Sequence, residues 1–559
     1  MKVGRRRPLP ALVALIGAVG AATSCAGAQT ARLSGGGGND GQVVRTEYGA
    51  VRGRLDGEVR TFQGIPYAAP PVGALRWRDP RPPARWKGAR DATRPGSPCP
   101  QEPGEVPTGS RNEDCLYLNV TTPKGDPAKP RPVIVWVHGG GFYMGAGSNY
   151  DAHRMAAQGD AVVVSVNYRV GVFGFFGHPG LEGSGTYGLK DQQTALSWVN
   201  RNIARFGGDP RNVTLASQSA GAVSGCAHLT SPGARGLFSK VILQTGSCSV
   251  GWPDNFDYRG QKAAEILQPR TAVEARGRRT ASEVGCTGDD QAVVACLRAL
   301  PVDKLMPVLG QYMFPAYGTD VLPTRPSRRA ACRTVPPRAG AVGEHPRRGH
   351  PVDGGLRGRR GGQRGPMTEQ TFDTVMTETF GEDEKAVRAE YPRSSYDSAA
   401  LAWSAIATDR KWVHAQYAMA RDLARRVPVY EYEFADPNAP ALAPGPPKMP
   451  MGAQHASELW YLFDLGGIPP KLDAEQRTLA RQMLGYWTSF AATGRPATAA
   501  ARGGRCSGRP GAAPLTSSPS RPAAAASAPS TWPPSTTSDS GRTSPADARS
   551  LTGSRGAPH

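Results

Sequence analysis

The chain has 559 residues, of which 39% are hydrophobic, and it carries a formal net charge of +21. This length and hydrophobic content suffice for a large buried core and leave the number of domains open. The charge would favour a nucleic-acid partner, but nearly all of it lies in residues 1–7, 327–365 and 495–559. Because the rest of the chain is close to neutral and these stretches lack interleaved aromatic residues, the sequence argues against nucleic-acid binding.

Residues 1–28 have the layout of a secretory signal peptide. Basic residues at positions 5–7 precede an apolar run, residues 11–22, that is too short to span a bilayer stably. Cleavage after Ala28 would release a free secreted protein, whereas cleavage before Cys25 would leave a lipid anchor on that cysteine, as in a lipoprotein. A buried N-terminal helix is the third alternative. In either exported form, residues 29–42 would serve as a Gly-rich linker.

Six of the nine cysteines lie outside the signal region and the two long basic stretches. They form three candidate disulfides, two of which enclose short loops. These disulfides would require an oxidising compartment. Buried free thiols are the alternative. The candidate pairs are Cys99 with Cys115, Cys226 with Cys248, and Cys286 with Cys296.

From residue 132 onward, apolar β-branched runs alternate with helical patterns. This alternation predicts an α/β fold with a mostly parallel sheet covered by helices on both faces. Apolar residues at three- to four-residue spacing make the first helix amphipathic. The predicted strands are 132–138, 161–166, 213–216 and 427–434, and the predicted helices are 189–206 and 222–229.

Ser219 stands between the strand 213–216 and the helix 222–229. A sharp strand-to-helix turn would push its hydroxyl out of the carboxyl edge of the sheet, as in a nucleophile elbow. Such a turn leaves room only for small residues two positions to either side; Gly221 meets this demand, and Ser217 replaces the more usual glycine. The first N–H groups of the helix would face developing negative charge.

Three consecutive glycines, residues 139–141, directly follow the strand 132–138. Backbone N–H groups can approach a substrate closely only where side chains are absent, so this run suits an oxyanion hole. The expected donors are the N–H groups of Gly140, Gly141 and Ala220. A flexible turn is the alternative interpretation.

Further strings lie before and after these two motifs. They are residues 62–68 (FQGIPYA), 113–120 (EDCLYLNV), 167–169 (NYR), 207–210 (GGDP) and 244–247 (QTGS). With the glycine run and the Ser219 turn, they resemble the type-B carboxylesterases, a family that includes bacterial para-nitrobenzyl esterases and cholinesterases. The resemblance covers residues 43–326 and 366–494. It implies one α/β-hydrolase catalytic domain over 43–494, ester hydrolysis through an acyl-enzyme, and the disulfides Cys99–Cys115 and Cys286–Cys296.

His455 is the predicted general base. In such hydrolases the nucleophile comes first in the chain, then the acid, then the histidine. His455 lies in residues 452–459 (GAQHASEL), which resemble the family's histidine segment. His414 falls in the helical pattern 410–426, where we assign it to packing.

The acid of the triad has no clear counterpart, because residues 327–365 are rich in Arg and Gly and show no hydrophobic period where a strand and the acid should stand. Glu344 and Asp353 are weak candidates. If residues 333–349 are translated back into G+C-rich codons and the reading frame is moved by one base, the new text can contain an apolar strand followed by Asp-Glu, as in the family. Residues 531–543 can likewise yield a family-like C-terminus. We predict that 327–365 and the low-complexity tail 495–559 are frameshifted; a disordered insertion and tail is the alternative.

Together, the residues and the resemblance predict a carboxylic-ester hydrolase that acts on a small-molecule ester without a cofactor or metal. Loss of the acid would impair it. A non-catalytic, esterase-like binding protein is the alternative. The loop between Cys99 and Cys115 contains no Trp, whereas cholinesterases bind a cation with a Trp there, so choline esters are disfavoured. We expect a secreted protein or an extracytoplasmic lipoprotein.

Overall fold

The computed structural model describes residues 42–256, 259–326, 367–442 and 450–497, and the backbone of 340–346. The predicted signal peptide with Cys25, most of the predicted linker and nearly all of the tail lie outside the described residues.

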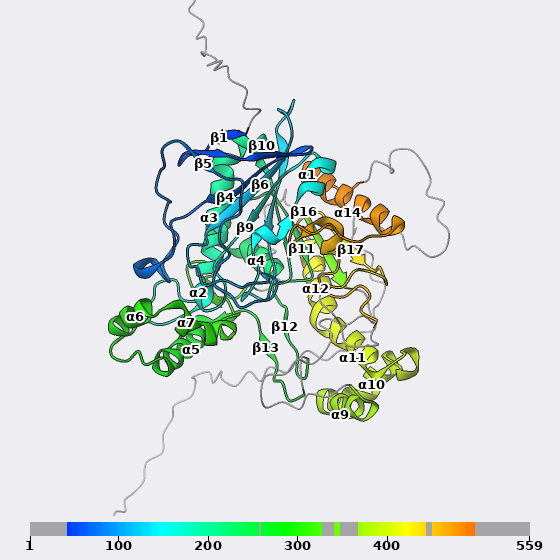
Figure 1. The fold of residues 1–559 in the computed structure, drawn as a ribbon. Coiled ribbons are helices and arrows are strands. Elements are labelled where there is room, and N and C mark those ends of the chain that lie inside the picture. The colour runs from blue at the N-terminus through cyan, green and yellow to red at the C-terminus, as the bar shows by residue number, and fades with distance from the viewer. Residues whose placement is uncertain (1–41, 257–258, 327–339, 347–366, 443–449, 498–559) are drawn as a thin grey trace, which may run out of the picture. The chain divides into compact units, whose positions relative to one another are not determined.

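A nine-stranded mixed sheet lies at the centre of the described chain (Figure 1). In spatial order its strands are β17 (Val429–Phe434), β16 (Gly340–Pro346), β11 (Lys240–Gln244), β10 (Gly208–Gln218), β7 (Arg131–Val137), β9 (Val162–Val166), β6 (Tyr117–Pro123), β4 (Val59–Pro66) and β3 (Arg54–Asp56). The strands from β17 to β9 are parallel, and β6, β4 and β3 are antiparallel. The predicted α/β fold with a mostly parallel sheet is confirmed.

Side chains of β7 alternate between two hydrophobic cores, one on each face of the sheet. Val133, Val135 and Val137 belong to one core, and Ile134 and Trp136 belong to the other. Because successive side chains of a strand point to opposite faces, a continuous apolar run marks a strand buried on both. The helices α3 (Tyr187–Asn202), α4 (Ala220–Thr230) and α12 (His414–Leu423) contribute to the first core, and α1 (His153–Gly159) and α14 (Ala474–Thr493) contribute to the second.

The predicted elements are present, with different bounds. The helix expected over 189–206 begins earlier, as α3, and its last four residues form a 3₁₀ turn, Ile203–Phe206. Gly207, with φ of +87°, then ends it in the left-handed conformation that glycine adopts without steric cost. The strand expected over 213–216 is the regular part of the longer β10.

Two helical groups follow β11 and β16 in the chain. The first consists of α5 (Arg270–Glu283), α6 (Asp290–Ala299) and α7 (Val302–Leu305), and the second of α9 (Glu369–Phe380), α10 (Glu384–Glu390) and α11 (Ala399–Thr408). Figure 1 shows them at the lower left and lower right of the sheet. The second group has a small core of its own, which includes Phe372, Met376 and Trp403.

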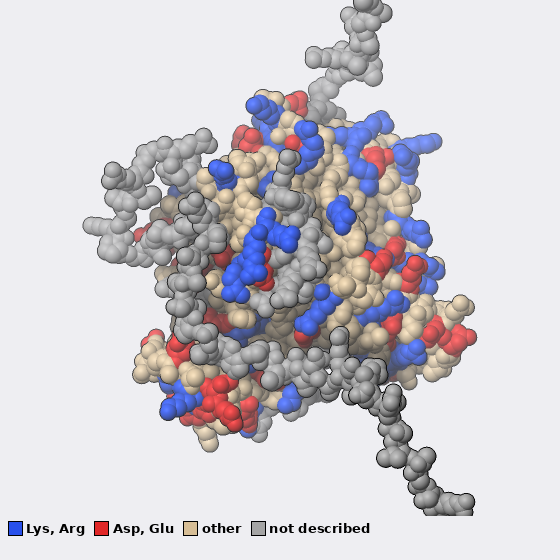
Figure 2. Space-filling view, turned by 180° about the vertical axis from the view of Figure 1, so that it is seen from behind, with Lys and Arg blue, Asp and Glu red and all other residues tan. Residues whose placement is uncertain are grey.

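Basic and acidic side chains are intermixed over the described surface that Figure 2 presents. Acidic side chains gather at the lower left of that view, over α9 and α10. Opposite charges also form ion pairs there, such as Arg393 with Glu369 and Arg388 with Asp373. A surface of this kind differs from the single-sign stripe that typically follows a nucleic-acid backbone.

Candidate active site

Ser219 occupies a tight turn between β10 and α4. Its backbone has φ of +55° and ψ of −123°, a conformation that costs energy for a residue with a side chain. Its N–H donates to Gln244 O at 2.9 Å, which fixes the turn against the end of β11. A Cβ at position 221 would overlap Val137 O, so the close approach of this turn to β7 requires Gly221. The turn leaves the Ser219 side chain partly exposed at the carboxyl end of the sheet.

His455 reaches Ser219 from a loop more than 200 residues later in the chain. Its Nε2 lies 2.9 Å from Ser219 Oγ and 3.3 Å from Gln218 Nε2. The loop is held by short-range bonds, among them Ser457 Oγ donating to Gln454 O at 2.8 Å. The imidazole ring stacks on Trp412, with centroids 4.9 Å apart and planes inclined by 16°.

The glycine run lies directly beside Ser219. A Cβ on Gly139 would stand 3.0 Å from Ser219 Cβ. Gly140 and Gly141 have φ of +85° and +59°, and a Cβ on Gly140 would overlap Met144 O. The curvature of this loop therefore requires glycine. The N–H of Ala220 belongs to the first turn of α4, where helical N–H groups have no partner within the helix.

The glycine loop, residues 138–146 between β7 and the following 3₁₀ turn, is supported by the packing of His138 against Tyr168. Their rings stack at 4.4 Å, and Tyr168 Oη donates to His138 O at 2.9 Å. Burial lowers the pKa of His138 to about 4, because the interior disfavours the charged imidazolium. His138 is therefore neutral and only weakly basic at ordinary pH, and its ring packs against Tyr168.

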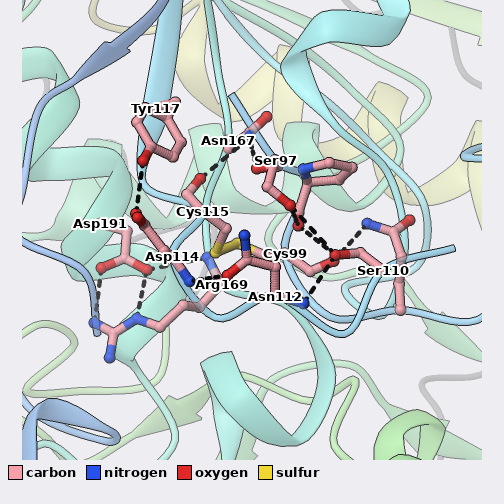
Figure 3. The surroundings of a disulfide bond; sticks show 12 residues. Ser97, Cys99, Ser110, Asn112, Asp114, Cys115, Tyr117, Asn167, Arg169 and Asp191 are labelled. Carbon is pink, nitrogen blue, oxygen red and sulfur yellow. Dashed lines mark hydrogen bonds and ion pairs between the residues drawn. A yellow bond between two sulfur atoms is a disulfide. The ribbon is translucent and has the colours of Figure 1, made fainter. Parts of the chain in front are cut away.

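The loop between Cys99 and Cys115 anchors the glycine loop from another side. Gln101, which is fully buried, accepts from Gly145 N at 2.8 Å and donates to Gly145 O at 2.9 Å. Figure 3 shows the disulfide that closes this loop, with Asn167 Nδ2 donating to Cys115 O at 3.1 Å. These bonds connect the start of the Cys99–Cys115 loop to Gly145 and its end to Asn167, which directly follows β9.

The three disulfides join the cysteine pairs that the sequence predicted. They are Cys99–Cys115, Cys226–Cys248 and Cys286–Cys296. The second connects α4, which begins after Ser219, to the loop that follows β11. Three disulfides indicate an oxidising, extracytoplasmic compartment.

The triad acid is not located by the described residues. Glu344 lies on β16, opposite Gln244 of β11 and Tyr432 of β17, but the side chains of this strand are not described. Asp353 lies outside the described residues. The stretch 327–365 showed no hydrophobic period, yet it contains β16. The physical reason is that β11 and β17 both offer backbone hydrogen-bonding groups on facing edges, so a chain can pair there whatever its side chains.

Within the described ranges, no cluster of three or more His, Cys, Asp or Glu side chains is arranged to hold a metal ion. None of the helices described has the length and apolar character needed to cross a membrane.

Comparison with known proteins decides the family. The family model described as the Carboxylesterase family matches residues 40–541. The chain belongs to the carboxylesterase family. Curated relatives of this carboxylesterase include the para-nitrobenzyl esterase of Bacillus subtilis (strain 168), 33% identical over 82% of this chain and 91% of the relative. The fumonisin B1 esterase of Sphingopyxis macrogoltabida is 33% identical over 82% of this chain and 83% of the relative.

Solved structures agree with this assignment. A PNB esterase structure matches the carboxylesterase with a TM-score of 0.65 and 30% identity, covering 82% of this chain and 92% of that chain. Among the curated relatives, the human cocaine esterase is 31% identical over 81% of this chain and 84% of the relative. The protein is therefore a type-B carboxylesterase with an α/β-hydrolase fold, an enzyme that acts on carboxylic ester bonds.

Two features of the site could not be found from the sequence. Trp412 belongs to a helical pattern in which an aromatic residue is an ordinary core residue, and nothing local marks its contact with His455. His138 adjoins the glycine run, but its neutral, supporting role depends on burial against Tyr168.

Proposed function

We propose that the carboxylesterase hydrolyses small-molecule carboxylic esters with Ser219 as nucleophile and His455 as general base. The distance of 2.9 Å between Ser219 Oγ and His455 Nε2 is the observation that carries the proposal. It lies within the range from which an imidazole can take the hydroxyl proton as the oxygen attacks.

The reaction proceeds in two halves. In the first, Ser219 Oγ bonds to the ester carbonyl carbon, its proton passes to His455 Nε2, and the carbonyl oxygen becomes an oxyanion. The N–H groups of Gly140, Gly141 and Ala220 would stabilise that charge. His455 then returns the proton to the departing alcohol, which leaves an acyl-enzyme. In the second half, water takes the place of the alcohol and releases the carboxylic acid.

Covalent labelling tests this proposal. A p-nitrophenyl alkylphosphonate should add its phosphonyl group to Ser219 with release of p-nitrophenol, and mass spectrometry should find the added mass on the peptide that contains residue 219. Ser219→Ala should abolish labelling. Ser231→Ala is the matched control, because Ser231 flanks the other end of α4, the helix that begins after Ser219. Labelling that persists in Ser219→Ala, or a parent chain that takes up no label, would contradict the proposal.

We propose further that residues 327–365 and 495–559 are encoded out of frame, so that the triad acid is missing from the chain as written. The support is the composition of the two stretches, the first rich in Arg and Gly and the second of low complexity, between and after segments that resemble the family. Loss of the acid costs about four powers of ten in turnover in a well-studied triad. The chain as written should therefore hydrolyse nitrophenyl esters slowly, and a frame-corrected chain much faster.

Resequencing the gene tests this second proposal directly. A shifted base near each boundary is the expected result. An intact reading frame that encodes the Arg-rich text unchanged would overturn it, as would equal turnover of the two chains.

We also propose that residues 1–28 direct export, as a free secreted protein or as a lipoprotein anchored through Cys25. The support is the basic head followed by a short apolar run. The mass of the mature N-terminal peptide distinguishes the two forms, because only the second begins at a lipid-bearing Cys25. A mature chain that still begins at Met1 would contradict both.

A further inference from the structure

A π-helical turn, Asp409–Val413, joins α11 to α12 beside the active site. Such turns widen the helix locally and are found frequently at functional sites. Two consecutive side chains of this turn are buried: Lys411 and Trp412 are each only 6% exposed. A charged and an aromatic side chain therefore lie buried at neighbouring positions.

Trp412 covers one face of the His455 imidazole. The two rings are nearly parallel, at 16°, with centroids 4.9 Å apart, which is within the range of favourable aromatic pairs. A ring held flat against a rigid neighbour can still slide in its plane but cannot tilt out of it. The plane of the imidazole determines whether Nε2 points at Ser219 Oγ, which it approaches to 2.9 Å.

The ammonium group of Lys411 contacts the indole of Trp412. Its ammonium lies 4.4 Å from the ring centroid of Trp412, 4.4 Å from that of Trp252 and 4.1 Å from that of Phe256. A cation attracts the negative face of each aromatic ring, and the attraction grows as water is excluded. One buried ammonium therefore connects Trp412 to two rings of the segment that follows β11.

The start of α12 is also fixed to the sheet. Gln416 Nε2 donates to Leu243 O of β11 at 3.0 Å, and Gln244, the next residue, accepts from Ser219 N at 2.9 Å. The helix that follows Trp412 and the turn that holds Ser219 are thus both hydrogen-bonded to the end of β11.

We propose that Trp412 is a positioning residue of the active site, which holds the imidazole of His455 in the plane that directs Nε2 to Ser219, and that Lys411 holds the indole in place. The inference rests on the proposed roles of Ser219 and His455. Its physical basis is that a catalytic group displaced by about 1 Å can lose about a hundredfold in rate.

Trp403 provides a matched comparison within the same helical region. It is also 6% exposed, but it packs in the small core of α9–α11 against Phe380, with ring centroids 6.4 Å apart. Truncating either tryptophan removes a buried indole. Only the truncation of Trp412 removes a ring from His455.

The test compares the rates at which a p-nitrophenyl phosphonate labels Ser219 in Trp412→Leu, Trp412→Phe and Trp403→Leu. We expect Trp412→Leu to slow labelling by about ten- to a hundredfold. Trp412→Phe keeps a flat ring and should recover most of the loss, and Trp403→Leu should label like the parent. With a nitrophenyl ester, Trp412→Leu should lower kcat and leave KM nearly unchanged, because substrate binding does not use the indole. Lys411→Met should slow labelling in the same direction.

Equal rates for Trp412→Leu and Trp403→Leu would overturn the inference, as would a Trp412→Phe variant as slow as Trp412→Leu. An unchanged rate in Lys411→Met would overturn the part assigned to Lys411. These outcomes differ from a failure of the proposed function, in which the parent chain itself takes up no label at Ser219. That last result would overturn both.

Discussion

His228 should make the stability of the protein depend on pH in a way that one substitution can isolate. It lies in α4, is 2% exposed, and its Nε2 lies 2.8 Å from Gln192 Oε1. Its Nδ1 faces the amide nitrogen of Gln193 at 3.4 Å, so Nε2–H donates and Nδ1 accepts. Burial lowers the pKa of His228 to about 4 from its ordinary 6.5, because the charged form would be desolvated.

The sign and size of the effect follow from this shift. The folded pKa is below the unfolded one, so the unfolded chain binds a proton more strongly between pH 6.5 and about 4. The contribution of the neutral imidazole to stability is fully present above pH 6.5 and is lost as the pH falls toward 4. The full shift is worth about 3 kcal/mol, of which about 2 kcal/mol is lost between pH 7 and pH 5.

Urea unfolding of the parent and of His228→Gln at pH 7 and pH 5 measures this loss. Glutamine does not titrate, so the difference in unfolding free energy between parent and variant should fall by about 2 kcal/mol from pH 7 to pH 5. All other titrating groups are common to both chains and cancel in the difference. A difference that is the same at both pH values would refute the reasoning, because it would mean that folding leaves the pKa of His228 unchanged.

Three further predictions concern the framework of the site. Gly221→Ala should yield little folded protein in a solubility and circular-dichroism assay, because its Cβ would overlap Val137 O, whereas Gly104→Ala, whose Cβ would make only an ordinary contact of 3.6 Å with Met144, should fold; equal yields would contradict this. Replacing Cys226 and Cys248 by Ser should lower the urea unfolding free energy by about 3 kcal/mol, and no change would show that the bond does not restrict the unfolded chain. Asp191→Asn should lower the urea unfolding free energy by about 3–5 kcal/mol, because it leaves the guanidinium of Arg169, which is 2% exposed, buried without its counter-charge. Asp56→Asn, in the exposed pair with Arg54, should lower it by less than about 1 kcal/mol. Similar losses in the two variants would disprove the role of burial.

Several parts of the site could be predicted from short stretches of sequence. The strand before Ser219, the small residue at Gly221 and the helix that follows together specify the nucleophile turn, because backbone sterics there admit few alternatives. The same holds for Gly140 and Gly141, whose positive φ and crowded surroundings require glycine. His455 could be predicted because the residues around it resemble a family segment.

Other features could not be predicted, because they depend on contacts between residues that are distant in the sequence. The pattern 410–426 indicates a helix but does not reveal the π-helical turn Asp409–Val413, since a widened turn is stabilised by packing and not by periodicity. The stretch 327–365 gave no sign of β16, since that strand is stabilised through pairing with β11 and β17.

The sequence by itself determined the fold class, the position of Ser219 in a strand-to-helix turn, the glycine loop and the candidate cysteine pairs, because each depends on backbone conformation or on residue types that lie close together in the chain. Only the tertiary structure decided that Trp412 stacks on His455, that Lys411 lies among three aromatic rings, and that His138 and His228 are neutral. These properties depend on which distant side chains exclude water and approach one another, and that is determined only when the sheet and its helices have packed.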